Sequence, residues 1–165
     1  MSIAGTDGFA DALADLDVTL VRTTEADAPG AIADLLRGDT VGVEPDCCSL
    51  PESVNTDPTW AEIETADTGV TPAALGVAEF GSVLVHETGR GEERASLHPR
   101  RHVAVLAASD LEPDLNAALP RIAEAASSTG SAVLTTGPSA TADMGGLVVG
   151  AHGPETVAVV LVEDA

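Results

Sequence analysis

The sequence predicts an α/β fold with a mostly parallel central sheet and flanking helices. The chain has 165 residues, of which 44% are hydrophobic, so it is large enough to fold around a core of its own. Short apolar segments alternate with segments of helical periodicity, which is the pattern of β–α–β units. Residues 103–107 are apolar without interruption, as a parallel strand buried on both faces is, and residues 157–162 form the most β-prone segment, also interpreted as a buried strand. We therefore expect residues 1–165 to form a single domain.

The first third of the chain predicts two helices and two strands in alternation. Phe9, Leu13 and Leu16 recur at helical spacing, and Pro29 stands where a second helix begins. Two strands joined by one short helix are typical of a parallel pair. The predicted elements are a helix at 7–16, a strand at 18–21, a helix at 30–37 and a strand at 41–43.

The middle of the chain predicts an irregular excursion at about 44–68. It contains Trp60, which we interpret as a clamp that holds the excursion to the domain, in preference to a platform for a ligand. Pro72, preceded by Thr71 as a cap, predicts the start of a short helix. Further elements are predicted as strands at 82–87, 103–107, 132–134 and 157–162, and as a helix from 109 or 110 to about 126.

The charge balance predicts an acidic, salt-adapted protein. The chain has 27 Asp and Glu residues against 7 Arg and no Lys, for a net charge of −20. Distributed carboxylates keep a protein hydrated at molar salt, and we favour this halophilic interpretation over an acidic surface for a basic partner. The lack of a basic patch also excludes nucleic acid as a partner.

The sequence predicts a cytoplasmic protein. No apolar run approaches the roughly 18 residues that a membrane span needs. The N-terminus has neither the basic region nor the long apolar region of a secretory signal.

Residues 135–155 predict a ligand cradle between two strands. Glycines and small hydroxyl side chains alternate there, so backbone N–H groups can converge on an anion. The alternative is a tight turn, in which Asp143 caps the local backbone instead of orienting a ligand hydroxyl or His152. Asp143 is a candidate catalytic residue. The candidate ligand-binding residues of this segment are Gly137, Ser139, Thr141, His152 and Gly153.

Glu79 is the second candidate catalytic residue. It stands in the segment AEFGS, between a predicted helix and a predicted strand, in apolar surroundings. A buried carboxylate there would serve as base, nucleophile or ligand anchor. The alternative is a carboxylate satisfied by nearby backbone N–H groups. Ser82, at the start of the following strand, joins the candidate ligand-binding residues.

The sequence predicts no metal site. Cys47 and Cys48 are adjacent, which disfavours a disulfide between them and does not match zinc or iron–sulfur spacing. Reduced thiols are the expected state, with a redox or metal role as the alternative. His98 and His102 are four residues apart, but Pro99 between them argues against a helical pair of metal ligands.

Three segments together resemble the LUD-domain family, in particular its lactate-utilisation protein C (LutC/YkgG) group. They are GVTPAALGVAEFGSVLV, ASLHPRRHVAVL and TGPSATADMGGLVVGAHGPETVAVVLVED. The resemblance covers roughly residues 67–163. The block GPSxTAD with the downstream GxHGP is its most specific part.

The resemblance implies a fold like that of the NagB/RpiA/CoA-transferase group. It also implies a part in a system that oxidises L-lactate to pyruvate, with iron–sulfur clusters in partner subunits and no cofactor in this chain. A small organic anion is the ligand that we expect. The alternatives are a stand-alone CoA-transferase-like or isomerase-like enzyme with Glu79 as nucleophile, and a non-catalytic scaffold subunit.

Overall fold

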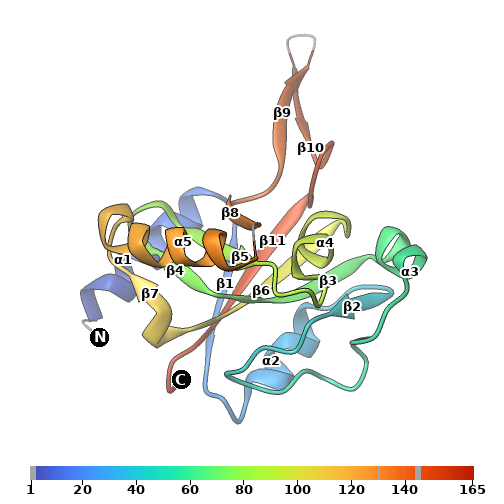
Figure 1. Ribbon diagram of the computed structural model, residues 1–165, viewed down its shortest axis with the longest axis horizontal. Helices are drawn as coiled ribbons and strands as arrows, with labels where there is room; N and C mark the ends of the chain where they lie inside the picture. The colour runs from blue at the N-terminus through green and yellow to red at the C-terminus, as the bar shows by residue number, and fades with distance from the viewer. Residues whose placement is uncertain (1–2, 130, 144–145) are drawn as a thin grey trace.

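A five-stranded parallel sheet forms the centre of the molecule, as the sequence predicts (Figure 1). The structure is a computed structural model that describes residues 3–129, 131–143 and 146–165. Each strand pairs in parallel with its neighbours, and the sheet order is β1–β11–β6–β3–β2. The strands are β1 (Thr19–Thr23), β11 (Thr156–Val162), β6 (Arg101–Ala107), β3 (Thr68–Ala73) and β2 (Thr40–Gly42).

Helices cover the two faces of the central sheet. Helix α1 (Ile3–Asp15) packs on one face through Phe9 and Leu13, and helix α2 (Ala28–Leu35) packs on the other through Ile32. Alternate residues of β11 face the two clusters, so this strand is buried on both sides as expected. Fully burying a side chain of this size stabilises the fold by about 1.5–3 kcal/mol.

The predicted strand–helix–strand unit is present, but its strands are not neighbours. Strands β1 and β2 occupy opposite edges of the sheet, and α2 lies between them in the chain. Strands β11, β6 and β3 fill the space between the two edges. The short helical connection therefore predicted the direction of the strands correctly, but not their pairing.

A second sheet, of four strands, packs beside α1 and carries the longest helix. Its order is β7–β4–β5–β8, and β5 is antiparallel to both neighbours. Helix α5 contributes Ala118 and Ala125 to the cluster that covers this sheet. The elements are β4 (Leu75–Val77), β5 (Ser82–His86), β7 (Leu111–Glu112), β8 (Ala132–Thr136) and α5 (Leu115–Thr129), with short 3-10 helices at η1 (Ala78–Phe80) and η2 (Ala108–Asp110).

Pro72 lies in strand β3, so the predicted helix at this proline is wrong. Strand β3 pairs with β2 only as far as Val70, while its pairing with β6 continues to Ala73. At Pro72, therefore, β3 has a partner strand only on its β6 side and none on its β2 side. Proline is tolerated where the missing N–H breaks no ladder hydrogen bond.

The excursion after β2 ends in helix α3 (Trp60–Thr65), which packs near helix α4 (Glu92–Leu97). The Arg94 guanidinium lies 4.8 Å from the centre of the Trp60 ring, and the His98 ring lies 4.9 Å from it at 80°. Trp60 thus contacts Arg94 in the last turn of α4 and His98 at its C-cap, as a clamp would. It remains 45% exposed, because it lies over the outer surface of the helix pair.

Residues 140–143 and 146–149 form an antiparallel pair of strands that projects from the body of the molecule (Figure 1). We call it the hairpin arm; its strands are β9 (Ala140–Asp143) and β10 (Gly146–Val149). The sequence predicted a cradle loop over this whole segment, which is wrong for the arm itself. Leu147, Val148 and Val149 on β10 are 74%, 41% and 49% exposed. No helix among the described residues is long and apolar enough to cross a membrane.

Candidate functional site

Part of the predicted cradle lines a pocket where the hairpin arm joins the body. We call this cavity of about 280 Å³ the hairpin-base pocket. It lies near the amino ends of β6 and β11, because His102 and Val157 form part of its wall. The predicted residues that line it are Gly137, Ser139, His152 and Gly153.

Backbone hydrogen bonds close the two chain segments of this pocket on each other. The Ser139 N–H donates to the Pro154 carbonyl at 2.9 Å, and the Gly150 N–H donates to the Ser139 carbonyl at 2.8 Å. A methyl group on Gly153 would lie 3.0 Å from Cβ of Ser139, so a larger residue would crowd the cavity. Gly137 has a φ of +70°, which favours glycine. These glycines hold the two segments close together.

His102 is a buried residue of this pocket. In the sequence it was a candidate only for metal binding, as the partner of His98. Its side chain has no exposed surface, and its Nε2 lies 2.8 Å from the Thr71 hydroxyl oxygen. Its Nδ1 is buried and has no hydrogen-bond partner among the described residues. Burial lowers the pKa of His102 to about 4, so the ring is neutral at neutral pH. A histidine within the apolar run of β6 is the signal that could have identified it.

The described residues that line the hairpin-base pocket include no Asp, Glu or Arg. The described residues that line it are two histidines with glycines, prolines, hydroxyl side chains and apolar side chains, and none has a carboxylate. This is unusual in a chain with 27 acidic residues. An anion entering this pocket meets hydroxyl and imidazole groups without a lining carboxylate to repel it.

The remaining predicted residues of this region lie outside the pocket wall. Ser82 is 1% exposed, and its hydroxyl lies 2.6 Å from the Thr136 hydroxyl, which ties β5 to β8. Thr141 lies on β9 opposite Val148. The side chain of Asp143 lies outside the described residues, so its predicted role is untested.

Glu79 does not have the predicted burial. It lies in η1 and is exposed, and its N–H donates to the Pro113 carbonyl at 3.1 Å. The short 3-10 turn ends at Gly81 in a left-handed conformation and leaves the Glu79 side chain at the surface. Glu79 lines neither the hairpin-base pocket nor the pocket described next. Its proposed catalytic role stays a prediction without support from this geometry.

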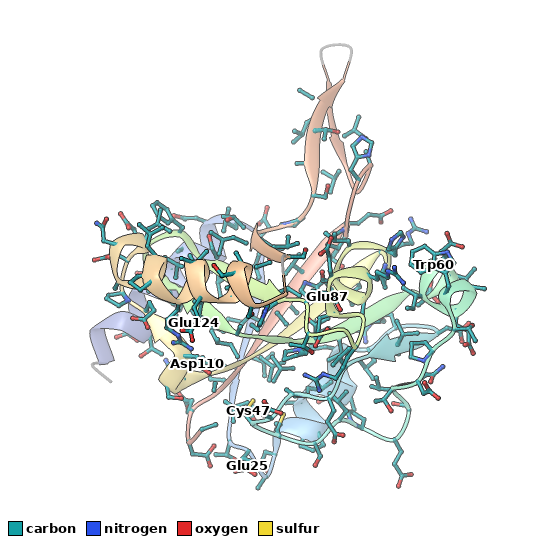
Figure 2. The ribbon with its side chains drawn as sticks, in the orientation of Figure 1. Glu25, Cys47, Trp60, Glu87, Asp110 and Glu124 are labelled. Atoms are coloured by element: carbon teal, nitrogen blue, oxygen red, sulfur yellow. The ribbon has the colours of Figure 1, made fainter. Side chains whose placement is uncertain are left out.

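A second pocket, of about 260 Å³, lies at the carboxyl ends of β3 and β6. We call it the carboxyl-edge pocket, and its position is where open α/β sheets bind ligands. Figure 2 shows Cys47 and Asp110, two of its lining residues, on the side of the molecule away from the hairpin arm. Its polar lining residues are Asp46, Cys47, His86, Thr88, Arg90, Glu92 and Asp110.

Glu92 is the buried charge of the carboxyl-edge pocket. Its carboxylate accepts hydrogen bonds from the Thr88 N–H at 3.1 Å, the Arg90 N–H at 3.3 Å and the Arg90 Nε at 3.2 Å. The Thr88 hydroxyl also donates to it. Burial raises the pKa of Glu92, but these hydrogen bonds and the Arg90 charge together hold the pKa below its ordinary value.

Cys47 and Cys48 are free thiols on one wall of the same region. The hydrogen bond between their side chains lowers the pKa of Cys47 and raises that of Cys48. Asp110 is paired with Arg121 at 2.6 Å, so it is not an unpaired acid. Among the described residues, no three His, Cys, Asp or Glu side chains are placed to hold a metal ion.

In a comparison with known protein families, residues 59–162 match the LUD domain. Lactate utilization protein C 1 of Bacillus mycoides is 33% identical over 106 residues, which are 61% of this chain and 45% of that protein. Lactate utilization protein C of Deinococcus radiodurans is 25% identical over 164 residues, which are 93% of this chain and 77% of that protein. The chain thus spans about half the length of the first relative.

A solved structure has the same fold. It is the crystal structure of a DUF162-family protein from Deinococcus radiodurans, with a TM-score of 0.71 and 23% sequence identity. The superposition covers 98% of this chain and 99% of that one. The likeness in fold therefore extends over nearly the whole chain.

Proposed function

Because the chain belongs to the LUD-domain family, we propose that it is a component of a system that oxidises L-lactate to pyruvate. One observation carries the proposal: the curated relatives that match it bear the name lactate utilization protein C. Both candidate pockets are lined largely by residues within the matched range 59–162. The activity of the longer relatives is transferred here as a proposal only.

The proposal includes partner subunits that carry iron–sulfur clusters. Oxidation of lactate to pyruvate releases two electrons and two protons, so an electron acceptor is required. This chain has two cysteines, which are adjacent, whereas a cluster usually needs four thiolates. The clusters are therefore placed in other subunits.

The hairpin arm is the surface that we assign to partner contact. Its exposed apolar side chains, Leu147, Val148 and Val149, stand on a projecting two-stranded ribbon. Exposed apolar groups that lie together are typical of interaction sites. In a chain of charge −20, an apolar arm also lets another subunit approach with less repulsion.

The first test is growth of the native host on L-lactate as sole carbon source after deletion of the gene. We expect the deletion strain to grow on pyruvate and to lose growth on L-lactate, and the intact gene to restore it. A deletion strain that grows normally on L-lactate would show that the proposed role is wrong.

The second test compares two exposed leucines in the complemented strain. Leu147→Asp on the hairpin arm should lose co-purification of iron–sulfur proteins, because it places a charge in the apolar contact. Leu119→Asp on α5 is the matched control, since Leu119 is 50% exposed and lies away from the arm. If both variants retain the same partners, the arm is not the partner surface.

A further inference from the structure

We propose that the hairpin-base pocket binds a small carboxylate monoanion, to which Nδ1 of His102 donates a hydrogen bond. The inference deepens the proposed function, because it gives the organic acid a place in this chain. It rests on that function only for the choice of L-lactate as one of the probes.

The first reason to infer a bound carboxylate is that Nδ1 of His102 lacks a hydrogen-bond partner among the described residues. Buried polar atoms in folded proteins nearly always have a hydrogen-bond partner, so an exception requires an explanation. The Nε2 atom is occupied by Thr71, which does not line the pocket, whereas His102 is one of the residues that line it. When the Thr71 hydroxyl donates to Nε2, the ring proton lies on Nδ1, and a ligand oxygen supplies the missing acceptor.

The charge of the pocket is the second reason, and it selects the class of anion. None of the described residues that line the pocket has a carboxylate, and Arg100, near its edge, is paired with Glu155 at 2.7 Å. The site thus offers the neutral ring of His102 and hydroxyl donors, and no Arg stands among the described residues of its wall. The cost of taking an ion out of water rises with the square of its charge, so this site favours a monoanion over a dianion.

The dimensions of the pocket are the third reason. Its volume of about 280 Å³ lies below the range of roughly 300–1,000 Å³ for drug-sized ligands, so the ligand is small. Gly153 bounds the cavity, and a methyl group there would lie 3.0 Å from Cβ and 3.3 Å from Oγ of Ser139. The absence of a side chain at this position keeps space beside the Ser139 hydroxyl open.

Nitrogen NMR of the histidine rings tests the proposal directly. The ¹⁵N-labelled chain is titrated at neutral to slightly alkaline pH with acetate, L-lactate and inorganic phosphate, while potassium sulfate maintains the ionic strength. We expect Nδ1 of His102 to shift saturably with acetate and L-lactate. Phosphate should bind at least about tenfold more weakly, because its second charge must also be desolvated.

Two glycine variants separate pocket binding from a general effect on the fold. Gly153→Ala should weaken acetate binding by about tenfold, because even one methylene in a packed space is costly to accommodate. Gly30→Ala is the matched control: it lies on α2, and no atom is within 4 Å of the position of its added methyl group. This variant should bind acetate as the parent chain does.

Three results would overturn the inference. They are a His102 signal that neither carboxylate moves, phosphate binding as strong as that of acetate, and an unchanged acetate affinity in Gly153→Ala. The outcome is separate from that of the growth test. If the chain binds acetate but is dispensable for growth on L-lactate, the inference about the pocket stands and the proposed function is wrong. If the chain is required for growth on L-lactate but does not bind acetate, the proposed function stands and the inference about the pocket is wrong.

Discussion

Glu92 has no exposed surface, although it is a charged residue in a predominantly acidic chain. Its neighbours explain how this is tolerated. The backbone of Thr88 and both the backbone and side chain of Arg90 present donors to the carboxylate. Hydrogen bonds to a buried charge are worth more than those between neutral groups, and an unmatched buried group is expensive. Glu92 therefore holds the turn before α4 in one conformation.

Glu92→Gln should lower the free energy of unfolding by about 2 kcal/mol at pH 7, because the amide presents N–H groups to neighbours that are themselves donors. Glu64→Gln removes an equal charge from an exposed position on α3 and should have little effect. Urea denaturation of the two variants and the parent chain measures the difference. Equal stability of all three would contradict the structural role of Glu92.

The effect of Glu92→Gln should depend on pH. The pKa of Glu92 is lowered in the folded chain, so its contribution to stability is present above the unfolded pKa of about 4.3. This contribution is lost as the pH falls through the lower folded pKa. The difference between the parent and the Gln variant should therefore shrink below about pH 4, since the parent carboxyl is then protonated too.

At the scale of elements, close contact between β3 and α4 depends on one glycine. A methyl group on Gly69 would lie 1.8 Å from the carbonyl oxygen of Ala95 and 3.0 Å from Cγ of Pro99. Backbone atoms of α4 cannot move away from such a contact without separating the helix from the central sheet. The adjacent strand residue on β6 is His102, so this packing also supports one wall of the hairpin-base pocket.

Gly69→Ala should destabilise the fold by about 3 kcal/mol, because overpacking against backbone cannot be relieved by a rotamer change. Gly8→Ala in α1 is the control, since no atom lies within 4 Å of the position of its added methyl group. An alanine there should stabilise the helix by about 0.5–1 kcal/mol. Thermal unfolding of both variants checks the prediction, and a loss of similar size in each would refute it.

At the scale of the whole molecule, the net charge of −20 dominates the response to salt. The exposed ion pairs, such as Arg22 with Glu163 and Arg100 with Glu155, involve a few of the 27 acidic residues, against 7 Arg in the whole chain. Salt weakens both the attraction within these ion pairs and the repulsion among the carboxylates. The screening length falls from about 10 Å at 0.1 M to about 3 Å at 1 M. Relief of repulsion should be the larger effect, because the acids greatly outnumber the bases.

The melting temperature should therefore rise steeply between low and molar KCl. Relief of about 3 kcal/mol of repulsion would raise the Tm by on the order of 10 °C in a chain of this size. Calorimetry across a series of KCl concentrations measures the rise. A Tm that stays flat over this range would contradict the proposed adaptation to high salt.

Local patterns in the sequence determined much of the fold. The helical spacing of Phe9 and Leu13 predicted α1, and the uninterrupted apolar run at 103–107 predicted a strand buried on both faces, which is β6. The spacing of apolar residues along a segment indicates which side of that segment is buried. This property is local, so it can be predicted from the sequence alone. The glycines and hydroxyl residues near Gly137 and Gly153 also predicted part of a pocket wall.

Only the tertiary structure decided which segments meet. The sheet order brings β11 between β1 and β6, and no local pattern specifies contacts between residues so far apart in the chain. The same long-range packing leaves Glu79 at the surface, where its apolar neighbours had predicted burial. It also encloses His102 beside Thr71 with one nitrogen unpaired, because burial and hydrogen bonding at that position depend on three strands and the base of the hairpin arm together.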